Sequence, residues 1–290
     1  MPQKGETMTV LWIFPGAVVL IAALWLFMIF PARADDTARK KFAGRCYAHR
    51  GLYDNAAGLP ENSLPAFENA MRKGYGCELD VQFTKDKKLI VFHDNDFKRS
   101  SGVDTPVWEL TYEEILRLPL FGTAEKVPLF SEVLRTVDGR NPLIVEIKAE
   151  GLNMAWYAEV CAATMEALRG YKGDYCVESF HPMVVRWLRR NAPSVIRGQL
   201  VNGHASSPNL PFAIAFPIEQ LWSGFLTRPH FIAYKEQDHN TALRVVQKLG
   251  AMSVMWTVRS PERHAELIKA EDAIIFEHYQ PEPRYTPSHN

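Results

Sequence analysis

Residues 77–94 read Cys-Glu-Leu-Asp-Val-Gln-Phe-Thr-Lys-Asp-Lys-Lys-Leu-Ile-Val-Phe-His-Asp, and this stretch decides the fold. Two apolar runs, Cys77–Phe83 and Leu89–His93, are separated only by the polar residues 84–88. A parallel crossover needs a dozen or more residues, so the two runs must form an antiparallel hairpin. Within the first run acidic and apolar side chains alternate, which predicts a strand whose two faces meet different surroundings.

The turn of this hairpin sets the register of its two strands. If Asp86-Lys87 is a two-residue turn, residue 85 pairs with residue 88, and Asp80 then lies directly across from His93. A slip of one residue would move His93 to the opposite face. The pattern therefore predicts a histidine beside a strand carboxylate, provided that the two-residue turn forms.

The rest of the chain extends the pattern of short apolar runs that alternate with helical stretches. Residues 45–290 are close to the roughly 250 residues of a (β/α)8 barrel, so we predict an α/β fold of the TIM type. The predicted strands are Cys46–His49, Cys77–Phe83, Leu143–Ile147, Tyr175–Phe180, Arg197–Val201, Phe231–Tyr234, Ser253–Val258 and Ala273–Glu277. The predicted helices include 63–73, with Ser63 as cap and Gly74 as stop, and 182–191, 240–249 and 261–270.

Composition narrows the class of protein. The 33 basic residues balance the 33 acidic ones, so no positive excess points to nucleic acid as a partner. The four cysteines, Cys46, Cys77, Cys161 and Cys176, lack the spacing of metal or redox motifs. We expect them to be buried free thiols.

The N-terminal region is expected to attach the chain to a membrane. After a tail at 1–7, residues 8–30 are free of charge and long enough to cross about 30 Å of hydrocarbon. A cleaved signal peptide is the alternative, with Ala32-Arg33-Ala34 as the cleavage site, although its apolar core would be only about 7–15 residues. The linker 31–44 carries most of the flanking positive charge, so we expect a single-pass helix with the catalytic domain in the cytoplasm.

Acidic side chains recur on two of the predicted strands. Glu78 and Asp80 are two residues apart and share one face of their strand, and Glu146 and Lys148 repeat this spacing on the next predicted barrel strand. Carboxylates that face a barrel interior repel one another and are costly to desolvate. A divalent cation relieves the repulsion, and the oxygen ligands favour Ca²⁺ or Mg²⁺.

Histidines and cations surround these carboxylates in the predicted topology. His49 and His93 are candidates for general acid–base catalysis, since imidazole gains and loses a proton near neutral pH. Arg50 and Lys148 are suited to hold a phosphate anion. Phosphodiester cleavage requires both kinds of group.

These residues, in this order, resemble the glycerophosphodiester phosphodiesterase family. The resemblance extends over the chain after residue 44 and is most specific in its first half. The matching motifs are His49-Arg50-Gly51, Pro60-Glu61-Asn62-Ser63, Ala66-Phe67, Glu78-Leu79-Asp80-Val81, Thr84-Lys85-Asp86, His93-Asp94 and Glu146-Ile147-Lys148, then more weakly Glu178-Ser179-Phe180 and Trp256-Thr257-Val258.

The resemblance implies a TIM barrel with a small insertion at about 95–126 and a reaction that releases glycerol 3-phosphate and an alcohol. It also implies one divalent cation on Glu78, Asp80 and Glu146, with Glu61 as a ligand or close by. His49 and His93 would be the acid–base pair, and Trp256 would line the pocket. The chain departs from the family at Phe276-Glu277, where a Thr-Asp pair is usual.

Other functions remain open from the sequence. The apolar stretch 208–226, with Phe212, Phe216, Leu221, Trp222 and Phe225, is either a loop and barrel helix or a lip that contacts lipid. A lip would favour a lysophospholipase D that acts on membrane lysophospholipids. The further alternatives are a lyase of the sphingomyelinase D kind, which forms a cyclic phosphate, and a non-catalytic membrane-bound barrel.

Overall fold

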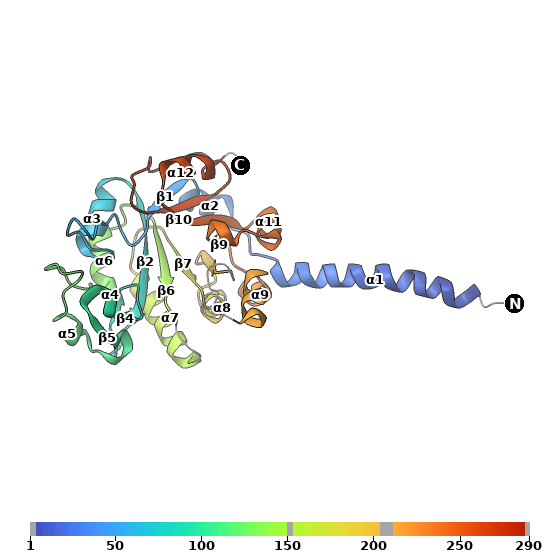
Figure 1. The fold of residues 1–290 in the computed structure, drawn as a ribbon, viewed down its shortest axis with the longest axis horizontal. Coiled ribbons are helices and arrows are strands. Elements are labelled where there is room, and N and C mark those ends of the chain that lie inside the picture. The colour runs from blue at the N-terminus through green and yellow to red at the C-terminus, as the bar shows by residue number, and fades with distance from the viewer. Residues whose placement is uncertain (1–3, 150–152, 204–210, 288–290) are drawn as a thin grey trace.

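Eight parallel strands close into a barrel in the computed structural model, which describes residues 4–149, 153–203 and 211–287 (Figure 1). The strand order is β1-β11-β10-β9-β8-β7-β6-β2, and β1 also pairs with β2, so the sheet has no open parallel edge. The parallel strands are β1 Arg45–Ala48, β2 Gly76–Phe83, β6 Leu143–Ile147, β7 Tyr175–Ser179, β8 Arg197–Val201, β9 Phe231–Tyr234, β10 Met252–Val258 and β11 Ala273–Phe276. The predicted TIM fold is confirmed.

Helices cover the outside of the barrel. They are α3 Leu64–Arg72, α6 Phe130–Val137, α7 Met154–Leu168, α8 Pro182–Asn191, α9 Phe212–Glu219, α10 Gly224–Thr227, α11 Thr241–Lys248 and α12 Pro261–Leu267. Ser63 caps α3 through its side chain, and Gly74 follows the helix with a φ of +83°. The predicted starts and ends of these elements therefore agree with the structure to within a few residues.

Strand β2 shows how alternation sorts its side chains between two environments. Cys77, Leu79 and Val81 are fully buried in the outer core between the barrel and its helices. Glu78 and Asp80 belong to the opposite face, toward the barrel interior, where they are also buried. The four cysteines are free and buried, as predicted.

The floor of the barrel is filled by apolar side chains and closed by a helix. The floor cluster includes Tyr47, Ile144, Phe231 and Met252, and Phe42 of helix α2 (Asp36–Phe42) packs among them. Residues 31–44 were expected to be a linker. Within this range residues 36–42 are helical, and burial of Phe42 against the barrel floor stabilises the helix.

The hairpin of β2 and β3 (Leu89–Val91) is antiparallel, but its predicted register was wrong by one residue. Val81 pairs with Val91 and Phe83 with Leu89, so Phe92 rather than His93 lies across from Asp80. The turn has three residues instead of two, with Lys87 in the left-handed region at a φ of +56°. A two-residue type I′ turn needs positive φ at both central positions, and this turn contains no glycine.

The insertion after the hairpin forms its own small unit. It consists of β4 Asp96–Phe97, α4 Lys98–Ser101, β5 Val103–Pro106, the 3₁₀ turn Val107–Glu109 and α5 Tyr112–Ile115. Phe97, Val107 and Ile115 are fully buried with Ile90 and Phe92 in a separate hydrophobic cluster. This cluster fixes the insertion beside the hairpin that carries His93.

Helix α1 (Lys4–Ile29) extends away from the barrel (Figure 1). Its last turn packs on the barrel: Ile29 is buried, and Arg228 donates hydrogen bonds to the carbonyl oxygens of Phe27 and Phe30. The side chains of residues 4–14 lie outside the description. Among the described residues, no helix combines the length and hydropathy needed to span a bilayer, so the transmembrane segment predicted at 8–30 is not supported here.

Candidate active site

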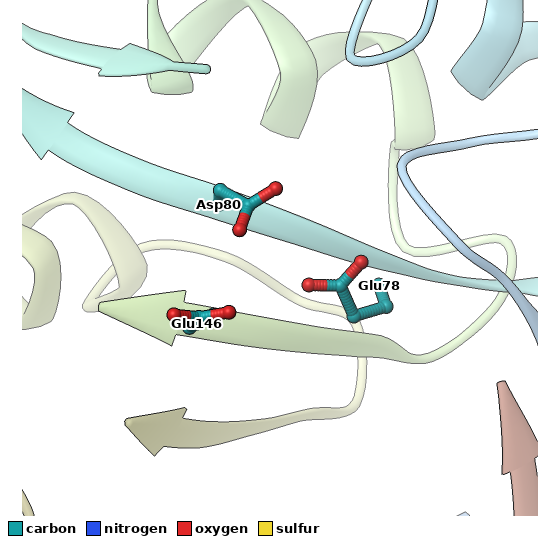
Figure 2. A group of neighbouring side chains, drawn as sticks. All are labelled: Glu78, Asp80 and Glu146. Atoms are coloured by element: carbon teal, nitrogen blue, oxygen red, sulfur yellow. The ribbon is translucent and has the colours of Figure 1, made fainter. Parts of the chain in front are cut away.

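Three acidic side chains meet inside the barrel near the ends of two neighbouring strands. Figure 2 shows Glu78 and Asp80 on β2 facing Glu146 on β6. One oxygen from each carboxylate lies within 4.8 Å of the others, and all three side chains are buried. Asp80 and Glu146 are paired residues of the parallel ladder, so the strand register itself sets their separation.

Burial and mutual repulsion shift the ionisation of this group. Burial, together with the charge of Asp80 and Glu146, raises the pKa of Glu78 well above its usual range. Burial also raises the pKa of Glu146. The pKa of Asp80 is lowered in spite of burial, because positive charge on His93, Lys148 and Arg50 favours its ionised form.

The carboxylate cluster fits a hard divalent cation. Asp80 Oδ1 is buried and has no hydrogen-bond partner among the described residues, while Asn62 donates to Oδ2 at 3.0 Å. An ion bound to Glu78, Asp80 and Glu146 would give this oxygen a partner and offset the repulsion that raises the pKa of Glu78. Carboxylate oxygens alone suit Ca²⁺ and Mg²⁺ equally well.

Two cations lie beside the carboxylates, as the sequence predicted. Lys148 Nζ is 3.2 Å from Glu146 and 3.6 Å from Asp80. Arg50 donates to Glu61 Oε1 at 2.6 Å, and its Nε is 3.9 Å from Asp80 Oδ2. Arg50 has a φ of +56°, and its backbone N–H also donates to Glu78. The turn after β1 therefore aims both backbone and side chain of Arg50 at the acidic group.

His49 is held by a carboxylate from the last strand end. Its Nδ1 lies 2.8 Å from Glu277 Oε2, and Tyr53 donates to the same oxygen at 3.0 Å. An ionised Glu277 can only accept, so Nδ1 carries the proton and Nε2 is the free lone pair. Nε2 lies 3.9 Å from Glu78 Oε2, on the side of the carboxylate cluster. Burial lowers the pKa of His49, and Glu277 opposes that shift.

His93 repeats this arrangement from the other side of the cluster. Its Nδ1 lies 2.7 Å from Asp94 Oδ1, and Arg99 Nε donates to Asp94 Oδ2 at 2.7 Å. His93 therefore reaches the site even though the register differs from the prediction, because β3 ends at Val91 and the chain turns after it. Both imidazoles line the same cavity.

Glu61 does not join the three carboxylates. Arg50 and Arg99 bind both of its oxygens, and Asn55 donates to Oε2 at 3.1 Å. Although burial opposes ionisation, these arginines lower the pKa of Glu61 to about 2. The structure thus places Glu61 as an anchor for two arginines that flank the site.

A cavity of about 890 Å³ opens over these groups and continues toward the strands on the far side of the barrel. Trp256 lines it, as the sequence predicted, together with Phe180, Asn202 and Lys235. The ladder between β10 and β11 shifts register between Met255 and Val258, and residues 255–260 at this break all line the cavity. Three residues of this site were assigned no role from the sequence. They are Glu277, Arg99 and Asn62.

A family model matches most of the chain: the model of the glycerophosphoryl diester phosphodiesterase family covers residues 49–279. A glycerophosphodiester phosphodiesterase of Bacillus altitudinis is 38% identical over 111 residues, which are 36% of this chain and 44% of that protein. One of Caldanaerobacter subterraneus is 32% identical over 163 residues, 53% of this chain and 65% of that protein. A lysophospholipase D of Rattus norvegicus is 32% identical over 137 residues, 43% of this chain and 42% of that protein. The chain spans about half the length of these curated relatives.

Solved structures share the fold over nearly their whole length. A phosphodiesterase of Oleispira antarctica, in complex with the product sn-glycerol-3-phosphate, superposes with a TM-score of 0.67 at 19% identity, over 84% of this chain and 96% of that one. A glycerophosphodiester phosphodiesterase of Thermotoga maritima gives 0.59 at 26% identity, over 80% and 93%. At these identities the first likeness concerns the fold alone.

Cation binding should stabilise the protein more at high pH than at low pH. Because the folded-state pKa values of Glu78 and Glu146 are raised, their contribution to stability is complete below the unfolded value of about 4.3 and is lost as pH rises through the raised values. A dication restores that loss. We expect Mg²⁺ or Ca²⁺ to raise the Tm of chelator-treated protein more at pH 8 than at pH 5, and Glu78→Gln to shrink the difference. Equal gains at both pH values would contradict the assignment of the cation to this cluster.

Replacing Glu277 should change the ionisation of His49. Glu277→Gln removes the negative charge that opposes the effect of burial, so the pKa of His49 should fall further. Histidine-selective NMR over a pH titration measures this value. Glu266→Gln, which changes an exposed carboxylate paired with Arg263, is the matched control and should leave His49 unaffected. An unchanged His49 titration in Glu277→Gln would show that Glu277 is not its partner in solution.

Proposed function

The chain belongs to the glycerophosphoryl diester phosphodiesterase family, and from this membership we propose that it hydrolyses glycerophosphodiesters to glycerol 3-phosphate and an alcohol. One observation carries the proposal. Three buried carboxylates and two histidines, each oriented through Nδ1 by another carboxylate, converge on one cavity. Every catalytic group that the family resemblance implies is present. This argues against a barrel that binds a ligand without catalysing a reaction.

The phosphate would lie in the cavity beside the carboxylate cluster and its neighbouring cations. A bound Ca²⁺ or Mg²⁺ supplies neutralisation of charge on the non-bridging phosphate oxygens. Lys148 and Arg50 add positive charge from the protein on the same side of the cavity. Lys148 acts as a point charge, whereas the planar guanidinium of Arg50 can offer two donors.

The two histidines would move the protons. Water attacks phosphorus, one imidazole takes its proton, the P–O bond to the alcohol breaks, and the other imidazole protonates the departing oxygen. Both rings present Nε2 because carboxylates hold Nδ1. The near symmetry of the two pairs, His49 with Glu277 and His93 with Asp94, leaves the acid and base roles interchangeable on geometry. A free monoester product distinguishes this hydrolysis from a lyase that forms a cyclic phosphate.

Lysophospholipid hydrolysis is a second candidate, favoured by an apolar surface around α9 and α10. Phe212 is 67% exposed, and Phe225 is 38% exposed and packs against Phe27 of α1. Three curated relatives bear the name lysophospholipase D. However, none of the described residues in 211–226 lines the cavity. This surface would therefore contact lipid beside the barrel rather than hold an acyl chain at its mouth.

Membrane attachment through α1 is the proposal for localisation. The charge-free run 8–30 supports it, as do the exposed Val18, Val19, Leu20 and Ile21. The positive charge of residues 33–45 would keep the barrel on the cytoplasmic side.

The full-length protein, purified in detergent, should release glycerol 3-phosphate from glycerophosphodiesters only when Mg²⁺ or Ca²⁺ is present. His49→Ala should lower kcat by at least about a hundredfold, because it removes a proton-transfer group. The dication should still bind, which calorimetry would detect. The control His239→Ala changes an exposed histidine outside the cavity and should retain activity. Turnover by His49→Ala at the wild-type rate would refute the mechanism.

A separate comparison tests lysophospholipid hydrolysis. Faster release of choline from lysophosphatidylcholine than from glycerophosphocholine would establish it.

Membrane attachment through α1 can be tested on the full chain. In cells that express the full chain, we expect the protein in the membrane fraction, resistant to a wash with high salt because apolar contacts are not screened by ions. A reporter at the C-terminus should be active only in the cytoplasm. Recovery of the full chain in the supernatant, or a reporter active only outside the cell, would contradict this placement.

A further inference from the structure

The cavity is larger than the phosphate site requires, and its second half has no role in the chemistry described above. Phe180 follows β7, Asn202 follows β8, Lys235 follows β9 and Trp256 lies on β10. They form the wall opposite the carboxylates and histidines of β1, β2 and β6. A phosphodiester extends in two directions from phosphorus, so a substrate held at the catalytic half must place one arm here.

In this half of the cavity, the ring face of Trp256 is covered and its indole N–H is an unpaired donor. Phe180 meets its ring edge to face, with ring centres 5.7 Å apart. Lys235 Nζ lies over the same indole, 4.6 Å from its centre. The indole Nε1 is buried and has no hydrogen-bond partner among the described residues. A buried indole N–H normally has a partner, so this donor is available to a ligand.

Lys235 contributes a positive charge that the nearby acidic residues do not neutralise. Within the described part of the chain, no carboxylate lies within ion-pair distance of its Nζ. The neighbouring cations differ, since Arg263 pairs with Glu236 and Arg259 pairs with Glu277. The wall therefore keeps one uncompensated cation at the face of its largest aromatic ring.

The same wall also offers an unused acceptor. Asn202 Oδ1 is buried without a hydrogen-bond partner among the residues that the structure describes. Together with Trp256 Nε1 and Lys235 Nζ, it gives donors and an acceptor within one lined space. Hydroxyl groups both donate and accept, so a polyol can satisfy all three.

We propose that this half of the cavity binds the alcohol arm of the diester and selects an uncharged polyol over a quaternary ammonium group. Quaternary ammonium ligands are recognised by open aromatic faces, but Lys235 occupies the face of Trp256 and repels a second cation. A polyol such as glycerol carries no such charge and brings hydroxyls to the unpaired donors and acceptor. The selection rests on the proposed phosphodiesterase function and names the class of its substrate.

The test compares glycerophosphoglycerol with glycerophosphocholine on the full-length protein with Mg²⁺. We expect kcat/KM of the wild type to favour glycerophosphoglycerol by roughly tenfold or more. Lys235→Gln removes the charge and should shrink that ratio at least about fivefold, mainly through KM for the choline substrate. Lys248→Gln is the control, since Lys248 is an exposed lysine on α11 away from the cavity, and it should leave the ratio unchanged.

Binding measured on an inactive variant tests the substrate selection separately from the proposed reaction. Calorimetry with His49→Ala should show tighter binding of glycerophosphoglycerol than of glycerophosphocholine, and adding Lys235→Gln should narrow the gap. If the wild type turns over neither diester but this binding preference persists, the proposed reaction fails and the selection stands. A wild type that prefers the choline substrate, or a Lys235→Gln change that affects both substrates equally, overturns the selection.

Discussion

The repulsion among Glu78, Asp80 and Glu146 is the constraint around which the cavity end of the barrel is organised. Parallel pairing of β2 with β6 places Asp80 beside Glu146, and the alternation of β2 places Glu78 on the same face. Burial makes this repulsion costly, so positive charge nearby is favoured. Lys148, Arg50 and a divalent ion are the available sources, and each is also a group that binds phosphate. The positive charge that offsets this repulsion is therefore also suited to bind a phosphate group.

Positive charge near the site is partly neutralised by acidic side chains. Glu61 binds Arg50 and Arg99, and Asp94 binds Arg99 again. These pairs hold the side chains of both arginines in place. The insertion contributes Arg99, so it does more than cover one side of the barrel: it orients Asp94, which in turn orients His93.

Most strands were predictable because they are short runs rich in apolar or β-branched residues, with polar or glycine-containing segments on either side. The bounds of Leu143–Ile147, Arg197–Val201 and Phe231–Tyr234 match the structure. His49 and His93 also line one cavity with Glu78 and Glu146, as expected from the sequence. The hairpin register was not predictable from strand patterns, since it depends on Lys87 adopting a positive φ. Helix α2 was missed because its short polar sequence gives little sign of the single apolar contact, at Phe42, that holds it against the barrel floor.

From the sequence, Glu277 was noticed only as a departure from the family pattern. Its contact with His49 could not be predicted, because it joins residues that are far apart in the chain. Glu277 lies 228 residues after His49, and only closure of the barrel between β1 and β11 brings the two together. A glutamate is longer than an aspartate by one methylene, so its carboxylate can reach His49 from a strand end while Tyr53 and Arg259 hold it in place. Glu277, which follows the last strand, thus places a carboxylate beside Nδ1 of His49. The same strand pairing that removes the open edge of the sheet therefore also brings His49 to its carboxylate partner.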